Sequence, residues 1–171
     1  MSDDAPKPET ASATPASGPA PDGAPAPPTV VDELVTTQHA LSTPQGDLAY
    51  TARAGRVVLW ADEVDGGVRK GRVAKAQVGV TAYTLDGADP LTRPVTFAFN
   101  GGPGSASVWL HMGVLGPRRV IMGDAGDLHA PPYGIADNPE TILAVSDLVL
   151  IDPVSTGHSR VVDGQKAKDF H

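Results

Sequence analysis

The chain has 171 residues, 40% of them hydrophobic and 19% charged, which is enough for one globular domain or part of one. Its formal net charge of −7 argues against a nucleic-acid partner, because phosphate backbones are bound by clustered Lys and Arg. The absence of cysteine excludes disulfides and thiolate metal sites. The His, Asp and Glu residues show no metal-ligand spacing, so we expect neither a metal nor a cofactor.

Residues 1–28 are rich in Pro and Ala and nearly lack large apolar side chains, so we expect a disordered tail. The start, from Met1 to Asp4, has no basic residue and no apolar core follows it, so no signal peptide or membrane segment is predicted. The cellular location and the oligomeric state are not predicted. Residues 29–47 are interpreted as a linker, with one helical turn of apolar residues before Pro44 and Gly46.

Antiparallel strands are predicted next, over residues 48–53, 57–61 and 74–85, because apolar and polar side chains alternate there. Gly66 and Gly67 supply a turn. The charged residues on either side of this turn predict a solvated hairpin.

The most informative stretch runs from Val95 to Ser107 and reads VTFAFNGGPGSAS. Residues 95–99 predict a buried strand, the glycines predict a sharp turn, and Ser105 or Ser107 could cap a following helix. A glycine turn after a strand can aim bare backbone N–H groups at an anion or an oxyanion. It can equally be a tight structural turn. A phosphate loop is less favoured, because neither GxGxxG nor a Gly-Lys-Ser/Thr ending is present.

Shorter elements are predicted after this helix. Residues 118–122 form a short strand, residues 142–145 a helical turn, and residues 161–171 the start of a helix. Residues 148–151 predict a second apolar strand, parallel to the first and buried on both faces. Asp152 ends this strand, and we expect its carboxylate to bond the loop that follows.

Two stretches carry a family resemblance. Residues 100–104 (NGGPG) resemble the oxyanion-hole motif of the serine carboxypeptidase family. The stretch that begins with Asn138, continues through DLVLID at 147–152 and ends at Ser159 resembles the family's next strand and its D-x-P-x-G-x-G-F-S loop. The resemblance spans about residues 48–160. It implies an α/β fold: the N-terminal part of an α/β-hydrolase domain over residues 48–171, with antiparallel edge strands followed by parallel strands and helices.

The resemblance also implies residue roles. The N–H of Gly102 would donate to the oxyanion. The Asn100 side chain and the Gly101 N–H would bind the terminal carboxylate of a peptide substrate with a free C-terminus. Trp109 would line the pocket for the departing residue, although it could equally belong to the core. His111 is expected on the helix surface, and His158 is expected to line a pocket or to pack.

The sequence departs from the family pattern at four positions. Ser105 follows the motif where cysteine is common, Val114 replaces a glutamate, and His158 replaces a phenylalanine. The loop after Asp152 is one residue shorter than the family's loop.

The catalytic triad is not among these residues. No GxSxG serine elbow occurs, and on this fold the acid and the histidine follow the serine in the chain. We therefore expect the Ser, Asp and His of the triad beyond residue 171 and the 171-residue chain to be inactive alone. The predicted function is the N-terminal fragment of a serine-type carboxypeptidase that acts through an acyl-enzyme. The alternatives are a prolyl-aminopeptidase-like hydrolase and a non-catalytic, truncated binding module.

Overall fold

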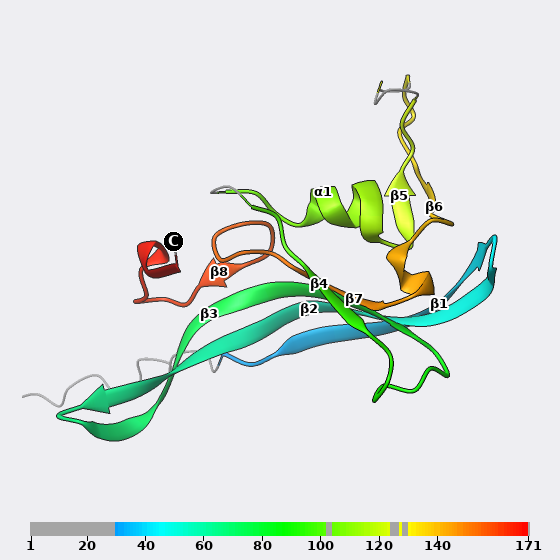
Figure 1. Cartoon of the computed structure of the whole chain (residues 1–171). Helices are drawn as coiled ribbons and strands as arrows, with labels where there is room; N and C mark the ends of the chain where they lie inside the picture. The colour runs from blue at the N-terminus through cyan, green and yellow to red at the C-terminus, as the bar shows by residue number, and fades with distance from the viewer. Residues whose placement is uncertain (1–29, 102–103, 124–126, 128–129, 171) are drawn as a thin grey trace, which may run out of the picture.

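The structure is a computed structural model that describes residues 30–101, 104–123, 127 and 130–170. Its main feature is a long, curved sheet with strand order β1-β2-β3-β7-β4, to which β8 adds by pairing with β3 (Figure 1). A separate hairpin, β5–β6, projects away from this sheet. The strands are β1 (Glu33–Thr43), β2 (Gly46–Asp65), β3 (Val68–Leu85), β4 (Val95–Ala98), β5 (Arg118–Val120), β6 (Ile135–Asp137), β7 (Asp147–Ile151) and β8 (Arg160–Val161).

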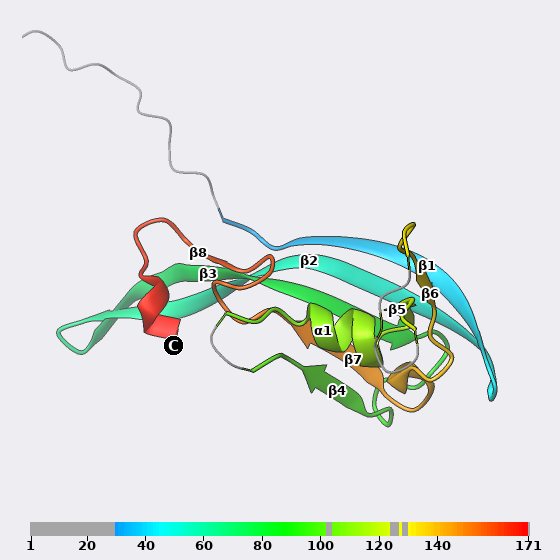
Figure 2. The ribbon, with the colours of Figure 1, turned by 90° about the horizontal axis from the view of Figure 1, so that it is seen from above.

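The helical elements are short. They are α1 (Val108–Leu110), the π-helix η1 (His111–Leu115) that continues it, and the 3-10 turns η3 (Ile142–Ala144) and η4 (Ala167–Phe170). Figures 1 and 2 together place α1 over β7, on one face of the sheet. No helix of the described residues is both long enough and apolar enough to cross a membrane.

The expected fold class is wrong. The described structure is 49% strand and 11% helix, a mixed and mostly antiparallel sheet, and not an α/β-hydrolase with helices. The physical reason is that residues 33–85 form three long strands joined by tight turns. In its described residues, the connection from β4 to β7 contains only short helical segments and the β5–β6 hairpin, and these do not form a helical layer over the sheet.

The first strand corrects the expectation of a helical turn before Pro44. β1 pairs with β2 along its whole length, from Glu33 opposite Arg56 to Thr43 opposite Gly46. Pro44 therefore does not interrupt an element but lies in the turn of a hairpin. Tertiary pairing with β2 outweighs the helical spacing of the apolar residues.

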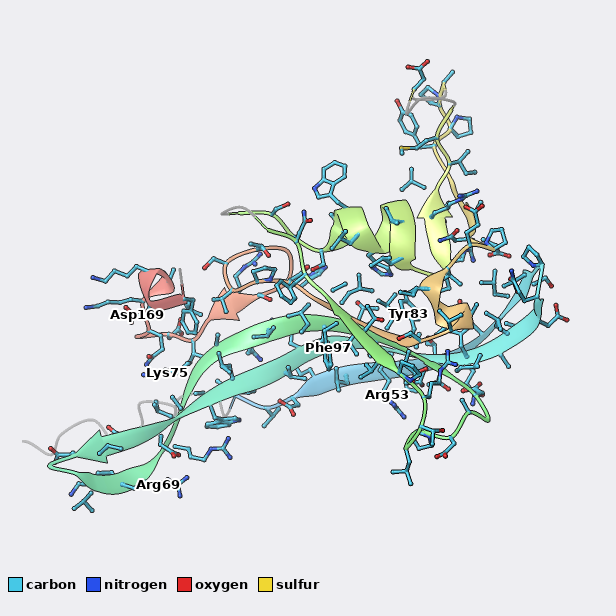
Figure 3. All side chains as sticks on the ribbon, viewed as in Figure 1. Arg53, Arg69, Lys75, Tyr83, Phe97 and Asp169 are labelled. Atoms are coloured by element: carbon cyan, nitrogen blue, oxygen red, sulfur yellow. The ribbon has the colours of Figure 1, made fainter. Side chains whose placement is uncertain are left out.

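The turn predicted at Gly66 and Gly67 is confirmed in the β2–β3 hairpin. The two strands predicted over residues 48–53 and 57–61 are parts of one continuous strand, β2. Gly66 and Gly67 have φ values of +57° and +78°, the left-handed pair that a tight hairpin turn requires. β2 continues through Gly55, whose φ is +156° and where a Cβ would overlap the carbonyl oxygen of Glu33. Only glycine fits at this position, and it allows β2 to continue without a break. Arg69 marks the far end of the hairpin, where it pairs with Asp62 (Figure 3).

The parallel pairing of β4 with β7 is confirmed, with Thr96 opposite Leu148 and Ala98 opposite Leu150. Leu148 and Leu150 are buried, but Val95 and Phe97 are 51% and 60% exposed. β4 is thus not the buried strand that was expected. It forms the edge of the described sheet, with a row of unpaired backbone groups and exposed apolar side chains.

An ion pair fixes the start of both parallel strands. The Arg93 Nε donates to the Asp147 Oδ1 at 2.6 Å, and the Arg93 Nη2 donates to the carbonyl of Leu143. The same carboxylate oxygen accepts from the backbone N–H of Leu85 at the end of β3. Both charged side chains are largely buried, at 12% and 19% exposure. Three elements of the sheet are therefore joined through one carboxylate.

Candidate functional site

The candidate site lies where β4 and β7 end. Because the two strands are parallel, their carboxyl ends meet at one edge, and the loops that follow them lie close together. The loop after β4 is here called the glycine loop, residues 100–107, of which 102 and 103 lie outside the described residues. The Asn100 side-chain amide donates to the Ser105 hydroxyl at 2.6 Å, a bond across the loop. Gly104 has φ +92°, which favours glycine there.

Asp152, directly after β7, ties the two loops together. Its Oδ1 accepts from the backbone N–H of Ser107 at 2.9 Å, and its Oδ2 accepts from the N–H of His158 at 3.0 Å. The Ser107 hydroxyl donates to the carbonyl of Ile151. The expected bond from Asp152 to its own loop is confirmed, and a second bond reaches the start of α1. Ser107 precedes the helix but makes no side-chain cap, because its hydroxyl is used in this link.

The loop after β7 closes tightly on this carboxylate. Gly157 has φ +46°, and a Cβ there would overlap the Asp152 carboxyl group. The Ser159 hydroxyl donates to the carbonyl of Asp152 and accepts from the backbone N–H of Gly79 on β3. Ser159 is fully buried. The loop is therefore held by hydrogen bonds to Gly79 on β3 and to Asp152 directly after β7.

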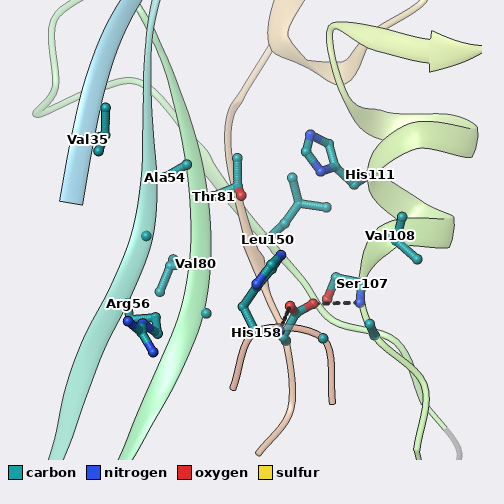
Figure 4. A pocket seen from close by; sticks show the side chains of 15 residues that line it. Val35, Ala54, Arg56, Val80, Thr81, Ser107, Val108, His111, Leu150 and His158 are labelled. Atoms are coloured by element: carbon teal, nitrogen blue, oxygen red, sulfur yellow. Dashed lines mark hydrogen bonds between the residues drawn. The ribbon is translucent and has the colours of Figure 1, made fainter. Parts of the chain in front are cut away.

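A cavity of about 860 Å³ lies between this loop, α1 and the face of the sheet. Its apolar floor comes from β2, β3 and β7, and His111 and His158 supply imidazoles to its wall (Figure 4). His158 was expected either to line a pocket or to pack, and it lines this cavity. Arg56 also lines the cavity, and its guanidinium forms an ion pair with Glu33 at 2.7 Å.

His111 is not on the helix surface as expected. Its Nε2 lies 2.6 Å from the Tyr83 hydroxyl of β3, and burial lowers the pKa of His111, against the opposing effect of Asp152. Burial raises the pKa of Tyr83 to about 12. Both groups are therefore neutral at pH 7. The spacing of four residues from Ser107 through His111 to Leu115 places all three on one helix face, a signal that could have predicted this position.

The sequence-predicted site residues are only partly brought together. Gly102 lies outside the described residues, so its N–H direction stays a prediction. Asn100 and the exposed Gly101 lie at the end of β4. Trp109 is 72% exposed and belongs to neither core cluster of the described residues, and its contact with a substrate stays a prediction.

The predicted disordered tail also lies outside the described residues. Over the part of the chain that the structure describes, no three His, Asp or Glu side chains gather as a metal site would require. No protein-family model matches the chain, and no curated protein matches it significantly.

Proposed function

We propose that this chain supplies the oxyanion and carboxylate-recognition loop of a serine-type carboxypeptidase. One observation carries the proposal: the NGGPG sequence follows β4 at the carboxyl end of a parallel strand pair, and Asp152 fixes the end of the same loop. A loop of this kind needs small residues near the substrate and rigid anchors at its ends. Asn100 and Ser107 provide the anchored positions on either side of the glycines.

In the proposed reaction, a serine hydroxyl attacks the carbonyl carbon of the last peptide bond, and the carbonyl oxygen becomes negatively charged. The N–H of Gly102 donates to that oxygen, and one such donor contributes about 3 kcal/mol to the transition state. The carbonyl re-forms as the C-terminal amino acid leaves, and water then hydrolyses the acyl-serine. The proposal requires an attacking serine, with its acid and its histidine, from outside these 171 residues.

The Asn100 amide and the Gly101 N–H are proposed to bind the substrate's terminal carboxylate. Hydrogen bonds to an ionised group are stronger than neutral ones, so these donors favour peptides with a free C-terminus over their amides. In the described part of the loop the Asn100 amide donates to the Ser105 hydroxyl. A side-chain amide has two N–H donors, and the second is the one proposed to bind the carboxylate.

Labelling with a fluorophosphonate tests this function. The protein from the complete reading frame should be labelled on one serine outside residues 1–171 and should remove the C-terminal residue from an N-blocked dipeptide. The 171-residue chain serves as the control and should be neither labelled nor active. Labelling of Ser105 or Ser107 would reject the proposal. Hydrolysis of proline amides would favour an aminopeptidase, and a stable bound protein without any hydrolysis would favour a binding module.

A further inference from the structure

The turn where α1 ends and η1 begins is built around the side chain of His111. The N–H of His111 donates to the Ser107 carbonyl at 2.9 Å, an α-type bond, and the His111 carbonyl accepts from the N–H of Gly116 at 3.0 Å, a π-type bond. A Cβ at Gly116 would lie 2.8 Å from the His111 ring. A single wide turn of this kind in a helix is often found at a functional site. Here it places the imidazole against the sheet.

The same side chain is the end of an aromatic row across the sheet. The ring of His39 on β1 stacks on Tyr50 of β2 at 5.3 Å, and Tyr50 meets Tyr83 of β3 edge-on at 5.8 Å. Tyr83 then contacts His111, with ring centroids 5.5 Å apart. This row of contacts thus links His111, which lies on η1, to three strands of the sheet.

We propose that His111 is a positioning residue, which locks the α1–η1 turn to β3 through Tyr83 and thereby sets the place of Ser107 at the end of the glycine loop. Asp152, at the end of β7, accepts a hydrogen bond from the Ser107 N–H. His111 lies four residues after Ser107 on the same helix face, and its bond to Tyr83 holds this face against β3. The loop end is held from two directions, as the pre-organisation of oxyanion donors requires. This inference rests on the proposed function for its catalytic consequence.

Two neutral groups suit this role. Water competes poorly for a half-buried hydrogen bond, and a neutral phenol and a neutral imidazole can share one without a buried charge, whichever of the two is the donor. The titratable groups that act on His111 in the described residues are Tyr83 on β3 and Asp152 after β7. His158 shares the cavity wall with it.

The test uses Tyr83→Phe and His111→Leu in the protein from the complete reading frame, with His111→Gln as the conservative variant. Gln can bond the Tyr83 hydroxyl from nearly the same place as the imidazole Nε2. We expect kcat per fluorophosphonate-titrated serine to fall about 10-fold in Tyr83→Phe and in His111→Leu, with KM nearly unchanged, since a displaced donor is felt in the transition state. The double variant should lose no more than either single variant, and His111→Gln should recover most of the rate.

Titration of the reactive serine separates positioning from folding, because unfolded molecules are not counted. The proposal would be overturned if kcat in all four variants equalled that of the wild type. It would also be overturned if the losses of Tyr83→Phe and His111→Leu added up in the double variant. Hydrogen exchange gives a readout that does not need activity: peptides covering residues 104–115 should exchange faster in Tyr83→Phe than in the wild type. If the protein proves to be no carboxypeptidase, the proposed function fails, and faster exchange in Tyr83→Phe still supports the positioning contact. Unchanged exchange there contradicts it.

Discussion

Replacing Asn100 with aspartate should lower kcat/KM by about 100-fold or more for an N-blocked peptide with a free C-terminal carboxylate. Losing a hydrogen bond to an ionised group costs about 1.5–3 kcal/mol, and the new carboxylate also repels the substrate's own. The amide of the same peptide carries no such charge and should lose much less. The comparison is made by steady-state kinetics on the protein from the complete reading frame.

Gln45→Glu is the matched control for this substitution. It makes the same amide-to-acid change at an exposed residue in the β1–β2 turn, so it alters net charge without touching the glycine loop. Its kcat/KM should equal that of the wild type for both substrates. If Asn100→Asp affected the free acid and the amide equally, Asn100 would not recognise the carboxylate.

Replacing Arg93 with methionine should lower the free energy of unfolding by about 3 kcal/mol, because a buried carboxylate would lose its cation. The Asp147 oxygen that accepts from Arg93 also accepts from the Leu85 N–H, so β3, β4 and β7 are all affected. Methionine keeps the length of the side chain, and the loss therefore reports mainly on charge and hydrogen bonding. Denaturant unfolding of the protein from the complete reading frame measures it.

Arg56→Met is the control for the Arg93 substitution. Arg56 pairs with Glu33 at a similar distance, 2.7 Å, but the two side chains are 40% and 56% exposed. An exposed pair contributes at most about 1 kcal/mol, so this variant should be nearly as stable as the wild type. Equal losses in the two variants would mean that burial does not decide the strength of these pairs.

Local features of the fold were predictable where one residue type dictates the backbone. The paired glycines at 66 and 67 require left-handed φ values, and the hairpin turn forms there. The parallel strands β4 and β7 were predictable because both are short apolar runs followed by turns. The bond from Asp152 to the next loop followed from its place at a strand end.

Other features depend on contacts that no local pattern records. β1 forms because β2 offers a partner over its whole length, and this pairing outweighs a helical spacing of apolar residues. The α/β expectation assumed that helices would cover the parallel strands, whereas the described connections contain only short helical turns. Tyr83 and His111 are 28 residues apart in the chain, and only the packing of η1 against β3 brings them together.

The central claim is that the glycine loop stabilises the oxyanion of a peptide bond under attack. A structure of the protein from the complete reading frame, with a peptidyl phosphonate bound to its reactive serine, tests this most directly. We predict a phosphonate oxygen at about 2.7–3.1 Å from the Gly102 nitrogen, the range expected of an oxyanion donor. An adduct whose oxygen is bound by other donors, with the Gly102 N–H directed elsewhere, would contradict the account.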